Sequence, residues 1–314
     1  MKKTIVVALG GNAISPEGRS DSIENQFKIT MQTAHALTGL VKKGYNLVIT
    51  HGNGPQVGNA LLRVELSKGK VPDLPLYICV ADVQGGMGFM IEQCLINAFK
   101  LKGIKKPIAT LITQVLVDKN DPSFINPTKF VGKFYTKEEV DYYIKNFGWR
   151  VKEVNGKGWR RVVPSPMPLG IINKEAIKEL LRKDFVVIAV GGGGIPVYID
   201  KKGMIHGVDA VIDKDIASAV LARDIEADEF LILTGEEKIY LNYGEINQKP
   251  LHRVTADELE KYYHEKHFPP GSMGPKVQAV LYFLKHKGKK AIITSVENAR
   301  EGLNESRATI IFPD

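Results

Sequence analysis

Four glycine-rich segments of this sequence are typical of backbone that binds anions. Three of them follow short apolar runs of strand length, and the fourth opens a helix-like stretch. Glycine lets a ligand approach the main chain closely, and the N–H groups of such turns and of helix N-termini favour negative charge. Together they predict a site for a phosphorylated ligand. The segments are residues 10–12, 52–58, 191–196 and 272–276.

None of these segments matches a standard nucleotide-binding motif. The first, Gly10-Gly11-Asn12, lacks the lysine of G-x-x-x-x-G-K-[ST]. The glycines of the second segment run G-x-G-x-x-x-G, which misses the dinucleotide fingerprint by one residue. A bound phosphate would therefore need its neutralising charge from elsewhere in the chain.

Two lysines lie where they could supply that charge. Phosphoryl transfer depends on cations around the migrating group, because its chemistry is mostly positioning and electrostatics. Lys214, between Asp213 and Asp215, and Lys276, in a Gly-Pro-Lys sequence, each stand at the start of a predicted helix. A lysine there opposes the helix dipole, which suggests a functional reason for it. The two aspartates could begin the helix, orient the lysines or hold Mg²⁺.

The composition is that of a globular chain of 314 residues, with 44% hydrophobic and 25% charged residues. This length suits one large α/β domain or two smaller ones. No apolar run in the sequence has membrane-spanning length, and the run at residues 4–9 is too short for the core of a signal peptide. We therefore expect a cytoplasmic protein that does not bind membranes.

The composition also argues against metal and nucleic-acid binding by the protein itself. Cys79 and Cys94 form no C-x-x-C pair, which fits a reducing compartment and predicts no metal site. The segment from His264 to His267 is one residue short of H-E-x-x-H, so we interpret it as a solvated helix end. The net charge of +8 is spread along the chain without an RNP-like pattern of aromatics. A site for small anions explains part of this excess, and we expect no nucleic-acid partner.

The elements that must position these residues alternate between strand and helix. The order β-α-β-α is typical of a mostly parallel sheet with helices on both faces, and ligands bind such sheets at the carboxyl ends of strands. The runs at 107–112 and 185–190 are apolar on both faces and predict central strands. The other expected strands are 4–9, 46–50, 229–233 and 291–295, and the expected helices are 23–42, 55–65, 81–100, 209–222 and 276–285.

One long segment, residues 118–168, breaks this alternation. It is polar, basic and punctuated by proline, and it is too long for a simple loop. A disordered insertion is one interpretation. Trp149, Trp159 and several Tyr and Phe residues favour some packed core instead. We therefore interpret 118–168 as an inserted, protruding lid subdomain.

Taken in order, these motifs resemble those of the carbamate kinases, which belong to the amino acid kinase superfamily. The resemblance covers nearly the whole chain, and the combination of motifs is more specific than any one of them. It implies one domain, 1–314, folded as an α/β three-layer sandwich with an open, mostly parallel central sheet. It also implies a carbamate-binding lobe at about 1–180 and a nucleotide-binding lobe at about 181–314. The matching segments are residues 8–13, 51–58, 164–166, 191–196, 213–215 and 273–276.

The resemblance implies a reaction as well: MgATP and carbamate would give ADP and carbamoyl phosphate, reversibly. Homodimers are usual in the family, and hand-off of the labile product to a carbamoyltransferase is an expectation. Asp215 would accept hydrogen bonds from the lysines, and the region from Thr234 to Tyr240 would lie near the adenine. The remaining implied contacts are Gly10, Gly11 and Asn12 with the transferred phosphate, Gly52, Asn53 and Gly54 with carbamate, and Lys214, Lys276, Met273 and Gly274 with the nucleotide.

The resemblance also suggests where the neutralising charge comes from. Superfamily members that act on carboxylates carry a lysine on the first strand, where this chain has Ala8. In carbamate kinases a lysine of the inserted subdomain takes its place, and here that residue would be Lys129. The usual prolines around it are replaced by Phe130 and Lys133, which makes Lys133 a second candidate.

Three other functions remain as alternatives. Another acyl-phosphate-forming kinase of the same superfamily would be expected to carry the first-strand lysine that Ala8 replaces. A dehydrogenase would need the dinucleotide spacing that residues 52–58 miss. A non-catalytic, nucleotide-binding regulator would have no need of Lys129, Lys214 and Lys276 together. The sequence does not indicate whether the reaction makes ATP or carbamoyl phosphate in the cell.

Overall fold

The computed structural model describes residues 2–15, 22–154, 156–269, 271–300 and 303–314. Its centre is an eight-stranded sheet in the order β15-β17-β16-β12-β1-β2-β9-β3. Neighbouring strands pair in parallel except β16 and β17, which are antiparallel. The predicted mostly parallel α/β sheet is confirmed. The strands are β1 (Thr4–Leu9), β2 (Asn46–His51), β3 (Ile108–Thr110), β9 (Val186–Ile188), β12 (Glu229–Thr234), β15 (Arg253–Thr255), β16 (Lys290–Ser295) and β17 (Thr309–Phe312).

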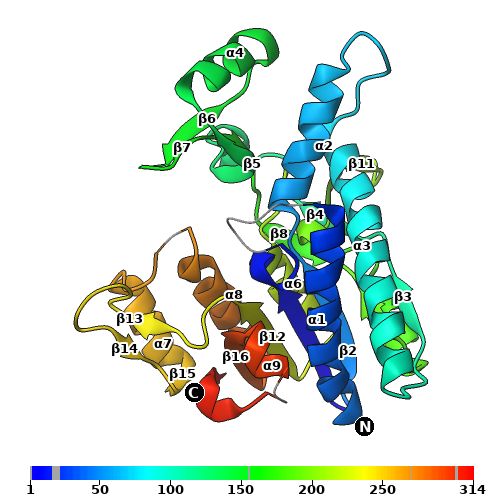
Figure 1. Cartoon of the computed structure of the whole chain (residues 1–314), viewed down its shortest axis with the longest axis vertical. Coiled ribbons are helices and arrows are strands. Elements are labelled where there is room, and N and C mark those ends of the chain that lie inside the picture. The colour runs from blue at the N-terminus through cyan, green and yellow to red at the C-terminus, as the bar shows by residue number, and fades with distance from the viewer. Residues whose placement is uncertain (1, 16–21, 155, 270, 301–302) are drawn as a thin grey trace.

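Helices cover both faces of this sheet, because successive side chains of each strand point to opposite sides. In β1, Ile5, Val7 and Leu9 pack into one apolar cluster with α1, α3 and α9, whereas Val6 and Ala8 pack with α5, α6, α7 and α8. The result is three layers, as predicted (Figure 1). The helices are α1 (Ile23–Lys42), α3 (Leu76–Leu101), α5 (Lys174–Arg182), α6 (Lys214–Asp224), α7 (Ala256–His264), α8 (Met273–Lys285) and α9 (Val296–Arg300).

Local capping residues set where the helices begin and end. Ser22 accepts a hydrogen bond from the Asn25 amide and caps α1, which stops before Gly44 in a left-handed conformation. This helix has the predicted bounds. The helix expected at 209–222 begins only at Lys214, because Asp213 is its N-cap. The helix expected at 81–100 begins earlier, directly after Pro75.

The prediction of a central strand at 107–112 is wrong. Its three-residue strand, β3, lies at the end of the sheet order and pairs only with β9, and its side chains are half-buried. The apolar run at 107–112 does not mean that strands flank β3 on both sides. Part of its apolar contact comes from the helix α3, which packs beside it. Thr110 marks this contact, since its hydroxyl donates to the Glu92 carboxylate at 2.5 Å.

A smaller sheet and a further helix lie between the central sheet and the inserted segment. The strands of this sheet pair in the order β11-β10-β4-β8, and only β10 and β4 are parallel. Buried side chains of β10, α2, α3 and the inserted segment share one apolar cluster. This smaller sheet was not predicted from the sequence. Its elements are β4 (Gln114–Val117), β8 (Pro168–Ile171), β10 (Ile195–Ile199) and β11 (Ile205–Gly207), beside α2 (Gly54–Leu66).

The described part of residues 118–168 contains a three-stranded antiparallel sheet, one α-helix and a single 3-10 turn at Pro122–Phe124. We call this segment the lid unit. Its strands are ordered β5-β7-β6, and the unit stands apart from the central sheet beside α2 (Figure 1). Tyr135, Val140 and Trp149 are buried in a small core of its own. The packed core favours the subdomain over the disordered insertion, while its motion as a lid stays a prediction. The elements are β5 (Lys129–Tyr135), α4 (Lys137–Phe147), β6 (Val151–Val154) and β7 (Gly158–Val163).

The lid unit rests on α2 through a glycine contact and an ion pair. A Cβ atom on Gly58 would lie 2.1 Å from the backbone of Gly132, which itself has φ +73°. Two bare backbones therefore meet here. Further along α2, Glu65 accepts hydrogen bonds from the Arg161 guanidinium at 2.6 Å and the Trp149 indole at 2.8 Å. Gly58 is the last glycine of residues 52–58, whose spacing misses the dinucleotide fingerprint by one residue. In the structure it allows α2 to pack against β5.

The strands β13 (Tyr240–Leu241) and β14 (Lys249–Pro250) form a separate two-stranded ribbon. Across the described residues, every helix is too short or too polar to cross a membrane.

Candidate functional site

A cavity of about 250 Å³ opens at the carboxyl ends of three neighbouring parallel strands. Its walls include Gly11 after β1, residues 52–56 after β2 and Gly192 after β9. This is the position where open parallel sheets bind ligands. Of the predicted site residues, the cavity is lined by Gly11, Gly52, Asn53, Gly54, Lys129, Lys214, Asp215 and Lys276.

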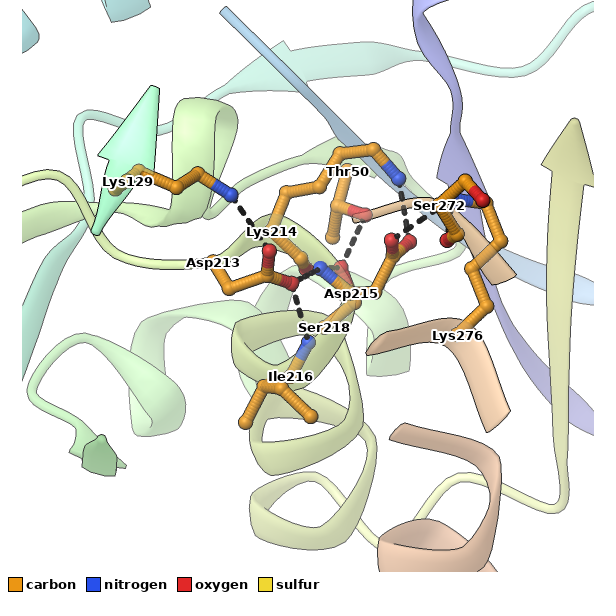
Figure 2. Close-up of polar contacts among 9 residues, drawn as sticks. All are labelled: Thr50, Lys129, Asp213, Lys214, Asp215, Ile216, Ser218, Ser272 and Lys276. Atoms are coloured by element: carbon orange, nitrogen blue, oxygen red, sulfur yellow. Dashed lines mark hydrogen bonds and ion pairs between the residues drawn. The ribbon is translucent and has the colours of Figure 1, made fainter. Parts of the chain in front are cut away.

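Three lysines from distant parts of the chain converge on this cavity, together with two aspartates. The Nζ atom of Lys129 lies 2.6 Å from Oδ2 of Asp213, and that of Lys276 lies 3.4 Å from Oδ2 of Asp215. Lys214 also pairs with Asp215. Figure 2 shows Lys129 reaching Asp213 on one side of the α6 N-terminus, with the other two lysines meeting Asp215. The cluster carries one more positive charge than negative charges.

Burial strengthens the electrostatics of this cluster. Burial lowers the pKa of Lys214, and the neighbouring ammonium of Lys276 adds to this, while the carboxylate of Asp215 opposes both. Burial alone would raise the pKa of Asp213, but the charges of Lys129 and Lys214 hold it well below its usual range. Asp213 is therefore an anion that helps to keep this dense group of ammonium groups in place.

The first turn of α6 is fixed against β2 by hydroxyl groups. Ser218 donates to the carbonyl of Lys214 at 2.5 Å, and its hydroxyl lies 2.6 Å from that of Thr50. Both hydroxyls are fully buried. The helix that carries Lys214 and Asp215 is thereby tied to the strand that leads into residues 52–56.

The first glycine segment turns tightly against β12. The amide of Gly10 donates to the carbonyl of Leu233 at 2.8 Å, and a Cβ on Gly10 would lie 2.6 Å from that oxygen. The N–H group of Gly10 is thus used within the protein. Gly11 is exposed and lines the cavity, and the Asn12 amide lies against Gly235, where a Cβ would come within 2.4 Å. Of these three predicted residues, Gly11 lines the cavity, whereas Gly10 and Asn12 are not among the described residues of its wall.

The third glycine segment supports the second. A Cβ on Gly191 would lie 2.3 Å from Nε2 of His51, and one on Gly192 would lie 2.0 Å from Nδ2 of Asn53. Only glycine leaves room for these two side chains. The turn is entered through Val190, whose φ of +53° is rare for a β-branched residue. Such strained backbone is typical of functional sites, and here it supports the residues 51–53 turn.

His51 sits beneath this turn as a buried, neutral imidazole. Its Nδ1 lies 3.0 Å from the carbonyl of Gly52, so the ring donates there. Burial lowers the pKa of His51 to about 4, the Gly52 hydrogen bond opposes this, and the charge of Lys214 lowers it further. The ring fixes the carbonyl of Gly52, which orients the amides that follow it.

A second, larger cavity of about 830 Å³ lies beyond the N-terminus of α8. Pro275 lines both cavities, and Gly274 lines the second. Met273, the first residue of α8, packs against the core beneath the sheet. Thr234 ends β12 and Tyr240 begins β13, but neither is among the described residues that line these two cavities. The aromatic and amide groups that do line the larger one include Asn242, Tyr243 and His267.

The sequence matches the amino acid kinase family over residues 3–295. The chain belongs to this family. Among relatives, the carbamate kinase of Pyrococcus furiosus is 45% identical over 100% of both chains. A carbamate kinase-like protein of Escherichia coli is 47% identical over 99% of both. A solved carbamate kinase of Giardia lamblia bound to AMP-PNP is 40% identical, covers 100% of this chain and 99% of its own, and superposes with a TM-score of 0.91.

Among amino acid kinases, this chain thus groups with the carbamate kinases. The structure also separates the two candidate lid lysines. Lys129 lines the cavity, whereas Lys133, on the same strand, pairs with Glu139 at 3.3 Å and lies over the Tyr135 ring. The side chain of Lys133 is 56% exposed. The geometry favours Lys129 as the lysine that reaches a ligand.

Sequence reasoning left some contributors to this amino acid kinase site unidentified. Ser272 is one, since its carbonyl accepts a hydrogen bond from Lys276 at 3.2 Å. Ser218 is another, and its signal was present, because it follows Lys214 by four residues and so shares its helix face. Asp213 was left with three possible roles, of which the structure shows two: it caps α6 and holds a lysine.

Proposed function

We propose that this chain is a carbamate kinase that transfers a phosphoryl group reversibly between MgATP and carbamate, with ADP and carbamoyl phosphate as the other pair. The observation that carries this proposal is the convergence of Lys129, Lys214 and Lys276 on one cavity beside two glycine turns. Its support is the full-length similarity to proteins named carbamate kinase at 45% identity. Both substrates are anions, and the site presents an excess of cations to them.

Different residues of the cavity would bind the two anionic substrates, the nucleotide and carbamate. Gly11, in the cavity wall, and the neighbouring Asn12 would donate hydrogen bonds to the transferred phosphoryl group. Residues 52–54 would donate to the carbamate. Lys214 and Lys276 would contact the nucleotide phosphates, with Asp215 fixing both ammonium groups. Lys129 would neutralise charge at the migrating phosphoryl group, which the first-strand lysine does elsewhere in the superfamily.

This arrangement requires no covalent intermediate and no strong general base. Carbamate is already an anion, so its oxygen can attack the γ-phosphorus directly. The protein must align the two reactants and offset their mutual repulsion. Alignment is worth several kcal/mol, and each preorganised donor or cation contributes about 3 kcal/mol.

We place the nucleoside in the larger cavity beyond α8, with the phosphates extending past Pro275 into the smaller one. Tyr243 and His267 offer flat surfaces for a base, and Gly274 lies at the junction. The proposed adenine region thereby extends beyond 234–240. In the described ranges no three His, Cys, Asp or Glu side chains gather into a metal site. Mg²⁺ would enter bound to the nucleotide phosphates, as part of the substrate.

We further propose a homodimer formed through α3 and the adjoining sheet edge. Phe89 on α3 is 63% exposed and Ile96 is 50% exposed, which is unusual for apolar side chains on one helix. Beside them β3 ends the central sheet, and open sheet edges are normally covered. A second copy of the chain would cover both features.

The cellular setting is also a proposal. Cys79 and Cys94 are both unpaired and buried, which supports a reducing compartment such as the cytoplasm.

Direct transfer of carbamoyl phosphate to a carbamoyltransferase would limit loss of this labile product. An assay that couples the two enzymes tests the idea, because hand-off should make citrulline-type product form faster than free diffusion allows. Equal rates with and without a competing trap would support hand-off, and full loss to the trap would contradict it.

The decisive experiment is a coupled assay of ATP formation from ADP and carbamoyl phosphate, with and without Mg²⁺. We expect Mg²⁺-dependent ATP formation by the purified chain. Lys214→Ala should lower turnover by about two orders of magnitude or more, the scale for lost transition-state donors. No ATP formation by protein that still binds ADP would move the proposal to another acyl phosphate or to a regulatory role. Near wild-type turnover of Lys214→Ala would contradict the assigned site.

A further inference from the structure

We propose that Asp213 is a positioning residue that holds the ammonium group of Lys129 over the phosphate cavity before substrates bind. The inference rests on the proposed function, and it concerns a residue that joins two separate parts of the chain. Lys129 begins β5 of the lid unit, whereas Asp213 precedes α6 in the core. One carboxylate therefore connects the lid unit to the helix that carries Lys214 and Asp215.

The two oxygens of this carboxylate have different partners. Oδ1 accepts the amide of Asp215 at 2.9 Å and that of Ile216 at 3.4 Å, which caps α6. Oδ2 accepts from Nζ of Lys129 at 2.6 Å. Figure 2 shows both sets of contacts leaving the same side chain. Capping immobilises the carboxylate, so the lysine is held by a group that cannot itself rotate away.

Lys129 needs such a partner because its side chain is long and only partly enclosed. Its side chain is 28% exposed, compared with 14% for Lys214 and 15% for Lys276. A free lysine side chain has many rotamers, and ordering it during the reaction would cost part of the catalytic advantage. The ion pair with Asp213 orders the side chain of Lys129 before substrates bind, so this entropy is not lost during the reaction.

The pairing leaves Lys129 able to bind a ligand. An ammonium group has three donors, and Asp213 accepts one of them. Both residues line the cavity, so an arriving phosphoryl oxygen can accept another donor without breaking the pair. Asp213 thus positions the ammonium group of Lys129, and it is Lys129 that contacts the reacting atoms.

The first test is chemical and requires no turnover. Lys129 of the free enzyme is acetylated with an amine-specific ester and followed by mass spectrometry, with Lys133 on the same strand as internal reference. In Asp213→Asn, which keeps the Oδ1 acceptor and removes the charge, acetylation of Lys129 should be about tenfold faster, the change expected for losing an ion pair worth 1.4 kcal/mol. Lys133 should react as before. An unchanged rate at Lys129 would overturn the proposal, whether or not the chain is a carbamate kinase.

The second test is a kinetic cycle of Asp213→Asn, Lys129→Met and the double variant. Asp213→Asn should lower kcat by between about 10- and 100-fold, the range for a misplaced catalytic group. If Asp213 acts through Lys129, the double variant will be no slower than Lys129→Met. Additive losses would contradict the proposal, whereas an inactive wild-type enzyme would contradict only the proposed function.

Capping must be separated from positioning. Asp213→Ser can still cap α6 but carries no charge. It should therefore change acetylation and kcat as Asp213→Asn does. Having two variants ensures that a folding defect in one of them does not prevent the test. The matched control is Asp121→Asn, which alters another capping aspartate, whose carboxylate accepts the amides of Ser123 and Met167. It should leave both the acetylation of Lys129 and kcat unchanged. Loss of kcat or faster acetylation of Lys129 in this control would contradict the proposal, because removing a capping carboxylate that does not pair with Lys129 would then be enough to cause the effect.

Discussion

Lys129 and Lys133 differ in their surroundings although they lie four residues apart on β5. The first pairs with Asp213 in the cavity, and the second pairs with Glu139 at the exposed side of the lid unit. Residues four apart would share one face of a regular strand, but the register of β5 against β7 shifts between Val131 and Tyr135, and Gly132 has a φ of +73°. This irregularity separates the two lysines, although their types and neighbours in the sequence are alike. A matched pair of variants can therefore test the assignment.

We expect Lys129→Ala to lower kcat for ATP formation by about 100-fold, because a cation at the migrating phosphoryl group is lost. Lys133→Ala should retain the wild-type kcat, since it removes an exposed pair of small energetic value. Steady-state kinetics of both proteins checks this prediction. Loss of activity in Lys133→Ala alone would reverse the assignment.

His51 makes stability depend on pH. Its folded-state pKa of about 4 lies below the usual value of about 6.5, because burial disfavours the charged ring. Between these pH values the unfolded chain binds a proton that the folded chain does not. The free energy of unfolding should therefore fall by about 3 kcal/mol as the pH drops from 6.5 to 4, and this contribution is complete above pH 6.5.

Urea unfolding between pH 4.5 and 7 measures this dependence. In His51→Asn, whose amide can still donate to the carbonyl of Gly52, the pH slope should fall by about one proton. His264→Asn, on a side chain that is 73% exposed, should retain the wild-type slope. Equal slopes for the wild type and His51→Asn would show that the imidazole is not held neutral.

Residue types and spacing predicted much of the candidate site. The Gly-Gly-Asn and Asp-Lys-Asp sequences lie at strand and helix ends, where local rules are strong, and Gly11 and residues 213–215 line one cavity. The partners of His51 and Asn53 could not be predicted, because Gly191 and Gly192 come from a segment far away in the chain. Glycine spacing alone suggested an anion-binding loop at residues 191–196. In the structure, glycine at positions 191 and 192 makes room for other side chains to pack.

At the scale of elements, α2 and β5 approach as closely as backbones can. Gly58→Ala would place its Cβ 2.1 Å from Gly132, so the lid unit or α2 must shift. We expect a loss of about 1 to 3 kcal/mol in unfolding free energy, as for other overpacked contacts, and a lower kcat because Lys129 moves with β5. Thermal melting and the coupled assay measure the two effects.

Gly39→Ala is the matched control for this helix substitution. Gly39 lies within α1 with open space around its Cβ position, so alanine there should raise stability by about 0.5 to 1 kcal/mol. Activity should not change. A Gly58→Ala protein with wild-type melting and turnover would mean that the contact does not fix the lid unit.

Elements with strong local signals were predicted well, and elements defined by distant partners were not. The capped helix at Ile23–Lys42 and the strand at Thr4–Leu9 have their expected bounds. The strand at Thr309–Phe312 was missed, and its antiparallel pairing with β16 depends on the end of the chain returning to the sheet. Residues 107–112 show the same limit, because an apolar run does not reveal whether a strand or a helix lies beside it.

At the scale of the whole molecule, the proposed dimer accounts for the apolar surface of α3. A stable interface covers about 800 Å² on each partner, and the exposed Phe89, Ile96 and Leu101 lie along one helix beside an open sheet edge. Light scattering during size-exclusion chromatography should give twice the chain mass of 34.7 kDa. The variant Phe89→Glu should elute as a monomer, because its carboxylate would be buried at the interface.

Phe134→Glu is the control for this substitution. Phe134 is also exposed, at 42%, but lies on the lid unit away from the proposed interface. It should leave the dimer intact. A wild-type chain that elutes at the monomer mass would contradict the proposed dimer and leave the site assignment unaffected.

The helix α2 has a consequence for the timing of the reaction cycle. Its first residue, Gly54, lies in the cavity, Gly58 contacts the lid unit, and Glu65 holds it by an ion pair. One helix therefore connects the proposed carbamate turn to the lid unit. We expect release of carbamoyl phosphate and withdrawal of Lys129 to be coupled, so that the labile product leaves when the enzyme resets and does not decompose beside the catalytic charge.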